Sequence, residues 1–378
     1  MEVITIIGWY GTETIGDRGI LAGLLRVFSE KYTSFSIRLG SLFPFFSERC
    51  LIEDISFYNR ISQNKLGVIQ VFDINDICTL KKNINDSSIV CFGGGPLMDI
   101  PYTFIMEYAM DYAHRKGIAT MILGCGVGPL SKKDIIKSVL RIIDQTDVCL
   151  FRDEKSVETY HILGGTKQIK SIIDPASFCA SYFFTNTAQK EQHIENSIVM
   201  NFRDVHKDQY STTNVSLYDD YFISLIRREL QTNPDMLVQL VPMHTFKHGG
   251  DDRYYLNYLR SLLSAEEQSK VFVHNNPLSL EDTMKIYFQA HHCYGMRFHA
   301  VLLQTLLNGR NIILDYTNPT KGKIIGLLQQ LSAISIYTHA YQSLSQPPYS
   351  TVLETPNHNP NKFHELIKYY FETFLESL

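Results

Sequence analysis

Short apolar runs alternate with longer segments of helical periodicity along most of the chain. In the first half, such runs are VITIIGWYG, SIVCFGGG, ATMILGCGVGP and DVCLFRD. The segments that follow them repeat apolar residues every three or four positions, as amphipathic helices do. Apolar strands that alternate with helices are typical of βαβ units with buried parallel strands. The pattern therefore predicts an α/β fold.

This alternation is interrupted once and then resumes. Residues 180–196 turn polar, and the new runs SIVMNFRD, MLVQLVPMH, KVFVHNN, HCYGMRFH and NIILDY follow. A chain of 378 residues also exceeds what one hydrophobic core usually serves. We therefore predict two doubly wound domains, residues 1–188 and 189–350, with a ligand crevice between them at the strand ends. Residues 351–378, a Pro-rich connector and an amphipathic helix, are expected to pack back on the domains.

Composition and charge restrict the class of protein. Hydrophobic residues make up 44% and charged residues 20%, which is typical of an ordered globular chain. A net charge of −4 without a basic run argues against a nucleic-acid partner. No apolar run approaches the roughly 20 residues of a transmembrane helix, so any membrane contact is expected to be peripheral.

The two remaining compositional signals concern the cellular compartment. The opening residues MEVITIIGWYG indicate a first strand rather than a signal peptide. The seven cysteines are odd in number and lack CxxC spacing, which indicates reduced thiols in a cytoplasmic protein and no zinc site.

The segment GWYGTETIGDRGIL is the first candidate for ligand contact. A strand ends near its first glycine and a helix begins near Asp17, so Gly11, Thr14 and Asp17 would lie beside free helix N–H groups that attract an anion. A glycine-containing turn with Asp17 as the helix cap explains the segment equally well. Because the glycine spacing differs from GxGxxG and no Walker lysine follows, the segment does not predict a nucleotide site.

The segment CFGGGPLMD is the second candidate. Its glycines Gly93, Gly94 and Gly95 remove every side chain from a strand end, whereas a tight turn rarely needs more than two glycines. We therefore favour close approach of a ligand or of the other domain over a structural turn. Asp99 lies just beyond and is expected to face the crevice.

Two further candidates follow strands of the second half. Arg203 ends the strand VMNFRD, where its planar guanidinium would suit a carboxylate or phosphate. A surface salt bridge with Asp204 is the alternative. His244 follows the strand MLVQLVPM, and Asp251 or Asp252 is expected to cap the next helix.

The segment MRFHA places Arg297 and His299 at the start of a helix. The helix dipole disfavours a cation there unless the cation binds an anion, so the pair indicates an anionic ligand. Neither side chain is expected in the core. Lys321 and Lys323 add positive charge before another helix.

Taken in order, these motifs resemble those of the polysaccharide pyruvyl transferases. The family pattern GYxGxxNxGD corresponds to GWYGTETIGD, and its GGG, RDExS and DPAF-like segments correspond to CFGGG, RDEKS and DPASF. The late RxHa and YxxxKxxGLL signatures correspond to RFHA and YTNPTKGKIIGLL. Two positions depart from the family, Thr14 in place of asparagine and Arg18 in place of an acid. These departures leave the acceptor sugar in doubt.

The resemblance implies a fold and an activity. The fold would be two Rossmann-like domains facing each other across a cleft, as in GT-B glycosyltransferases, with the acceptor on the first domain and the donor on the second. The activity would be transfer of pyruvate from phosphoenolpyruvate to a sugar, as a ketal. The acceptor would be a cell-surface polysaccharide or exopolysaccharide, or its lipid-linked precursor at the inner face of the membrane. Phosphoenolpyruvate would be a co-substrate, and no cofactor or metal is expected.

By the same resemblance, Arg203, Arg297 and His299 map onto donor-binding positions. Lys323 is a further cation that the sequence offers for phosphoenolpyruvate. His299 or His244 is the expected acid or base, because imidazole titrates nearest working pH, and the sequence does not divide the roles between them.

Two other functions remain open at this point. A nucleotide-sugar glycosyltransferase of the same shape would also place cations at a helix start of its second domain. A non-catalytic binding protein could retain the fold, although the Arg297/His299 pair argues against it.

Overall fold

In a computed structural model, the chain divides into two compact units. Unit 1 comprises Met1–Cys179 and Leu366–Leu378, and unit 2 comprises Ala180–Glu365. The structure describes residues 1–378 except 13, 188–191, 206–215, 248–249, 321, 346, 348, 351 and 357. The domain boundaries predicted at 188–189 and 350–351, like Lys321, fall on or beside residues outside this description.

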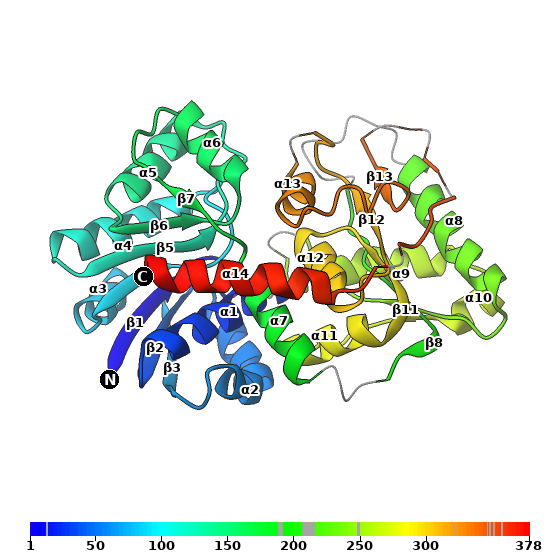
Figure 1. Ribbon diagram of the computed structural model, residues 1–378, viewed down its shortest axis with the longest axis horizontal. Helices are drawn as coiled ribbons and strands as arrows, with labels where there is room; N and C mark the ends of the chain where they lie inside the picture. The colour runs from blue at the N-terminus through cyan, green and yellow to red at the C-terminus, as the bar shows by residue number, and fades with distance from the viewer. Residues whose placement is uncertain are drawn as a thin grey trace. The chain divides into compact units, whose positions relative to one another are not determined.

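Unit 1 is built on a parallel sheet (Figure 1). Among the described residues it has seven strands in the order β3-β2-β1-β4-β5-β6-β7. The strands are β1 (Glu2–Ile7), β2 (Phe35–Ser41), β3 (Leu66–Asp73), β4 (Ile89–Phe92), β5 (Ala119–Cys125), β6 (Val148–Phe151) and β7 (Lys170–Ser171). The order reverses between β1 and β4, which is the switch point of a doubly wound sheet.

Helices cover both faces of this sheet. They are α1 (Ile15–Lys31), α2 (Pro44–Ile61), α3 (Ile77–Asn85), α4 (Thr103–Arg115), α5 (Lys133–Asp144) and α6 (Glu154–Ile162). Side chains of α3 to α6 form one core with Ile7, Val90 and Phe92 of the strands. Leu24 of α1 lies on the opposite face, near Ile6 and Cys91, because adjacent strand residues point to opposite faces.

Unit 2 repeats this architecture. Its parallel sheet has six strands among the described residues, in the order β10-β9-β8-β11-β12-β13. The strands are β8 (Ile194–Met200), β9 (Leu237–Leu240), β10 (Val271–Val273), β11 (Ala290–Gly295), β12 (Asn311–Asp315) and β13 (Tyr341–Ser343). The order reverses between β8 and β11, so this sheet has its own switch point.

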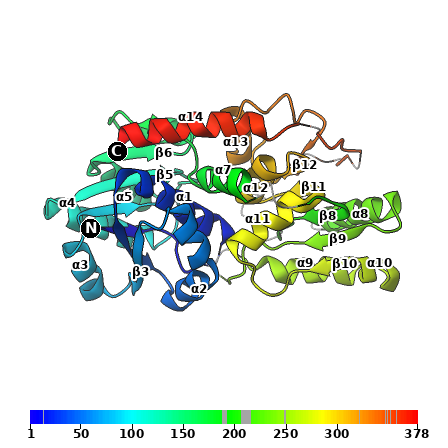
Figure 2. The same cartoon turned by 60° about the horizontal axis from the view of Figure 1, so that its bottom comes forward.

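The helices of unit 2 also lie on both faces. They are α8 (Ser216–Thr232), α9 (Asp252–Ser261), α10 (Ala265–Lys270), α11 (Leu280–Gln289), α12 (Phe298–Leu307) and α13 (Lys323–Gln330). In the view of Figure 2, α13 lies toward the upper side of this unit and α9 and α10 along its lower side. The core on the α8 and α9 side includes Phe222 and Leu256, which pack against strand residues such as Met200.

Two helices contribute residues to both units, α7 (Ala176–Asn186) and α14 (Asn361–Ser377). Phe374 of α14 packs edge-on against Phe178 of α7, with ring centroids 5.5 Å apart, and both residues belong to unit 1. No helix among the described residues has the length and apolarity needed to cross a membrane. The prediction of two Rossmann-like α/β domains is confirmed.

The glycines after β4 pack closely against their own unit. A Cβ on Gly94 would meet the ring of Tyr10 at 3.1 Å, and one on Gly95 would meet Trp9 at 2.0 Å. Gly95 also has a positive φ of 68°. Packing inside unit 1 therefore accounts for these two glycines without a ligand, whereas the sequence favoured close approach of a ligand or of the other domain.

Gly95→Ala should lower the free energy of unfolding by more than Gly117→Ala. Both glycines have φ of +68°, but nothing lies within 4 Å of a Cβ at Gly117. The control substitution therefore adds only the left-handed backbone cost of about 1 kcal/mol, and Gly95→Ala adds the overlap with Trp9. Urea unfolding of the two variants measures the difference. Equal losses would show that packing against Trp9 does not require a glycine at position 95.

Candidate functional site

The carboxyl ends of four neighbouring strands in unit 2 carry the candidate residues. Arg203 follows β8, His244 follows β9, Arg297 follows β11 and Tyr316 follows β12. These strands flank the switch point of the sheet, where α/β folds bind ligands. Lys323 is the first residue of α13, the helix after β12. We refer to Arg203, Arg297 and Lys323 as the cation cluster.

Asp252 organises one side of this site. Its side chain is 1% exposed, and its two carboxylate oxygens accept from Nε and Nη2 of Arg297 at 2.8 and 2.5 Å. The Oδ2 atom also accepts from the backbone N–H groups of Met243 and His244 at 3.0 and 3.1 Å. A single buried carboxylate therefore holds the Arg297 guanidinium against the end of β9.

Asn201 holds the backbone of Arg297 in the same way. It lies directly after β8 and is fully buried. Its Oδ1 accepts from the Arg297 backbone N–H at 3.1 Å, and its Nδ2 donates to the carbonyl of Val241 at 2.9 Å. Side chain and main chain of Arg297 are thus both fixed to neighbouring strand ends.

His244 lies beside two cations. Its side chain is 7% exposed, and Nε2 is buried without a hydrogen-bond partner among the described residues. Burial, together with the charges of Arg297 and Arg203, holds the pKa of His244 well below its ordinary value. The imidazole is therefore neutral at pH 7, because its protonated form is disfavoured.

Tyr316 connects the rest of the cation cluster. The Arg203 guanidinium lies 4.7 Å from the ring centroid and the Lys323 ammonium 5.5 Å from it. Burial would raise the pKa of Tyr316, but the positive charges of Lys323, Arg203 and Arg297 outweigh it and lower the pKa to about 8. Three positive side chains thus act on one partly buried phenol.

The structure brings together four of the predicted donor-side residues, Arg203, His244, Arg297 and Lys323. Arg203 and Arg297 act electrostatically on His244, and both act with Lys323 on Tyr316. His299 is the second residue of α12, two positions after Arg297. Arg297 is the residue before the helix, and its anion is Asp252 of the same chain. The Arg297 charge at the helix start is therefore compensated within unit 2 and does not by itself require an external anion. The expected role of Arg297 in donor binding stays a prediction.

In unit 1, the predicted acceptor-side residues Gly11, Thr14 and Asp17 line one pocket together with Trp9 and Tyr58. The alternative in which Asp17 caps α1 is wrong. Thr14 is the N-cap, and its side chain accepts from the backbone N–H of Asp17 at 3.0 Å. Threonine at this position satisfies a helix N–H that would otherwise be unpaired.

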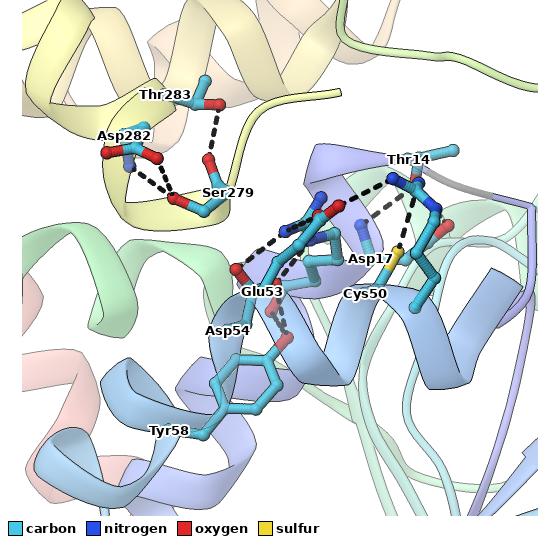
Figure 3. Close-up of polar contacts among 11 residues, drawn as sticks. Thr14, Asp17, Cys50, Glu53, Asp54, Tyr58, Ser279, Asp282 and Thr283 are labelled. Carbon is cyan, nitrogen blue, oxygen red and sulfur yellow. Dashed lines mark hydrogen bonds and ion pairs between the residues drawn. The ribbon is translucent and has the colours of Figure 1, made fainter. Parts of the chain in front are cut away.

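Arg18, which departs from the family pattern, is engaged by two acids of α2. Its Nε and Nη2 donate to the two oxygens of Asp54 at 2.5 and 2.7 Å, and Nη2 donates to Glu53 at 3.0 Å. Figure 3 shows Glu53, Asp54 and Tyr58 on α2, and the Tyr58 hydroxyl donates to Asp54 at 3.3 Å. The buried Arg18 charge is compensated by these acids and joins α1 to α2.

Asp99 has structural partners in the loop before α5. Its Oδ2 accepts from the backbone N–H and the hydroxyl of Ser131 at 2.6 and 2.5 Å. Burial acts to raise the pKa of Asp99, but these bonds and two longer ones from the Lys132 backbone N–H outweigh it and lower the pKa. A contact of Asp99 with a ligand stays a prediction, as it does for Gly93, Gly94 and Gly95.

Sequence reasoning missed Asp252 and Tyr316 as site residues. The sequence offered Asp252 only as one of two possible helix caps, and Asp251 is in fact the N-cap of α9. Tyr316 has no sequence signal beyond its place as the first letter of YTNPTKGKIIGLL. Among the described residues, no group of three or more histidine, cysteine, aspartate or glutamate side chains could hold a metal ion. The expectation that the reaction needs no metal stays a prediction.

Comparison with known proteins places the sequence and the fold. Residues 15–318 match the sequence profile of the family described as polysaccharide pyruvyl transferase. No curated protein matches the chain. Among solved structures, a protein from Listeria monocytogenes described as a UDP-N-acetylglucosamine 2-epimerase is similar in fold, with a TM-score of 0.52 and 12% identity over 100% of this chain and 90% of its own. The ADP-heptose heptosyltransferase II of E. coli gives a TM-score of 0.49 at 11% identity, over 99% of both chains.

Asp252→Asn should lower the free energy of unfolding by about 3 kcal/mol, because it removes one partner of a buried ion pair and weakens two backbone N–H bonds. Asp251→Asn is the matched control. Asparagine caps a helix as well as aspartate does, and the lost pair with Arg253 is partly exposed, so about 0.5 kcal/mol is expected. Urea unfolding compares the two variants. If Asp252→Asn lowers the free energy of unfolding by no more than Asp251→Asn does, Asp252 does not organise the site.

Proposed function

The chain belongs to the polysaccharide pyruvyl transferase family, and on that premise we propose that it transfers pyruvate from phosphoenolpyruvate to a sugar as a ketal. The acceptor in this proposal is a cell-surface polysaccharide or its lipid-linked precursor. The observation that carries the proposal is the cation cluster at the strand ends of unit 2.

Phosphoenolpyruvate carries a carboxylate and a phosphate on one small molecule. Such a ligand is held best by several cations whose positions are set before it arrives. Arg203 and Lys323 lie on the ring of Tyr316, and Asp252 orients Arg297. In the proposal these three cations bind the two anionic groups, and His299, at the first turn of α12, contributes to the same donor site.

The neutral His244 suits the second half of the reaction. Ketal formation joins two hydroxyls of one sugar to C2 of the donor, and each hydroxyl must lose its proton. An imidazole kept neutral by its burial and by Arg297 and Arg203 presents an unprotonated ring nitrogen, although its lowered pKa makes it a weaker base than a free imidazole. We therefore assign His244 as a base toward the acceptor rather than as the acid.

The proposal predicts that phosphoenolpyruvate raises the melting temperature of the protein and that Arg203→Ala removes this effect. A ligand at one hundred times its Kd stabilises the folded state by about 2.7 kcal/mol. Arg203 is a better test than Arg297, because Arg297→Ala would leave the buried Asp252 unpaired and cost roughly 3–5 kcal/mol.

Arg227→Ala is the control for this experiment. Arg227 lies on α8 in an exposed pair with Glu267, so its loss should leave the phosphoenolpyruvate shift unchanged. UDP- and GDP-sugars are tested beside phosphoenolpyruvate. A shift with a nucleotide sugar and none with phosphoenolpyruvate would replace this proposal with a glycosyltransferase. No shift with either would favour a binding protein that retains the fold.

A further inference from the structure

Transfer from phosphoenolpyruvate needs an acid as well as a base. The methylene carbon C3 of the donor must gain a proton before C2 becomes electrophilic. His244 does not suit this step, since it is held neutral by burial and by two arginines. The acid is therefore His299 or another proton-bearing side chain that reaches the cation cluster.

Tyr316 lies where such an acid is needed. It directly follows β12, and its ring packs against the core of unit 2 while remaining partly exposed. Arg203 and Lys323 lie 4.7 and 5.5 Å from the ring centroid. A phenol in this position would contact an anion held by the same two cations.

The backbone around Tyr316 is fixed by the residue before it. Asp315 is fully buried, and its Oδ1 accepts from the backbone N–H and hydroxyl of Thr317 at 2.7 and 2.6 Å. Its Oδ2 accepts from the hydroxyl of Tyr341 at 2.7 Å. The chain is thus held on both sides of Tyr316, which sets the direction of the phenol relative to the cations.

We propose that Tyr316 is the catalytic acid that protonates C3 of phosphoenolpyruvate. This inference rests on the proposed function. The phenol O–H bond breaks, the C2=C3 electron pair forms the new C3–H bond, and C2 becomes a cation stabilised by its enol oxygen. One sugar hydroxyl adds to C2 and gives its proton to His244. The second hydroxyl then displaces phosphate from C2, and its proton returns to the phenolate while the His244 proton leaves with phosphate.

The electrostatics of the cluster support this role. The phenolate formed by proton transfer is stabilised by Lys323, Arg203 and Arg297, the charges that overcome burial and bring the pKa of Tyr316 to about 8. An acid with a pKa near the working pH is both protonated and able to release its proton. A tyrosine outside such a cluster titrates near about 10 and is a weaker acid.

Tyr316→Phe tests the inference, with Tyr349→Phe as the matched control. Tyr349 is a partly buried tyrosine of the same unit whose hydroxyl donates to the carbonyl of Leu344. We expect Tyr316→Phe to lower acceptor-dependent phosphate release by about a hundredfold or more, as loss of a general acid does, while the thermal shift with phosphoenolpyruvate persists. Tyr349→Phe should retain the wild-type rate.

The pH profile gives a readout that a structural role would not produce. The acid must be protonated, so the wild-type kcat/KM should fall as pH rises through the Tyr316 pKa of about 8. Site-specific 3,5-difluorotyrosine at position 316 lowers the phenol pKa and should move this alkaline limb to lower pH. If Tyr316→Phe fails to fold, the protein with 3,5-difluorotyrosine at position 316 still tests the inference.

Three outcomes would overturn the inference. The first is that Tyr316→Phe releases phosphate at a rate within about threefold of wild type. The second is that 3,5-difluorotyrosine at position 316 leaves the alkaline limb of the pH profile at the same pH. The third is that Tyr316→Phe weakens phosphoenolpyruvate binding by as much as it lowers the rate. Failure of the proposed function is distinguishable, because the wild-type protein itself would then release no phosphate from phosphoenolpyruvate with any acceptor.

Discussion

The buried carboxylate of Asp252 is the contact on which the site in unit 2 depends. It joins the start of α9 to the end of β9 through two backbone N–H groups and to Arg297 after β11 through two guanidinium nitrogens. An arginine before a helix start is unfavourable by itself, because the dipole of α12 repels positive charge. Asp252 compensates that charge and fixes its direction.

The positive charges at the strand ends act in the same direction on two neighbours, because they lower the pKa of both. They disfavour the protonated form of His244 and favour the ionised form of Tyr316. His244 thereby stays unprotonated and is a weaker base than a free imidazole, and Tyr316 becomes a better proton donor than a phenol in water. Groups whose pKa values are shifted by a cluster of charges are typical of sites of acid–base catalysis. Binding of a multiply charged anion and proton transfer would thus have the same physical origin.

The sequence predicted the two α/β domains well, because alternating apolar runs and amphipathic segments are local patterns that the sheets of both units preserve. It also predicted that cations gather at the ends of the second sheet, since residues after parallel strands meet at one edge. It could not predict the pairing of Asp252 with Arg297, which are 45 residues apart. Nor could it show that Trp9 and Tyr10 pack on Gly94 and Gly95, so these glycines were interpreted as space for a ligand. Both cases concern tertiary contacts that no local pattern records.

The central claim is that unit 2 binds phosphoenolpyruvate for pyruvyl transfer to a sugar. Nuclear magnetic resonance of a reaction with phosphoenolpyruvate and a panel of lipid-linked and simple galactosides, mannosides and glucosamines measures phosphate and ketal together. If the claim holds, inorganic phosphate appears only with a competent acceptor, in equal amount to a new ketal methyl group. The claim would be contradicted if phosphate were released at the same rate without an acceptor. It would also be contradicted if a new sugar product formed from a nucleotide sugar while phosphoenolpyruvate stayed unchanged.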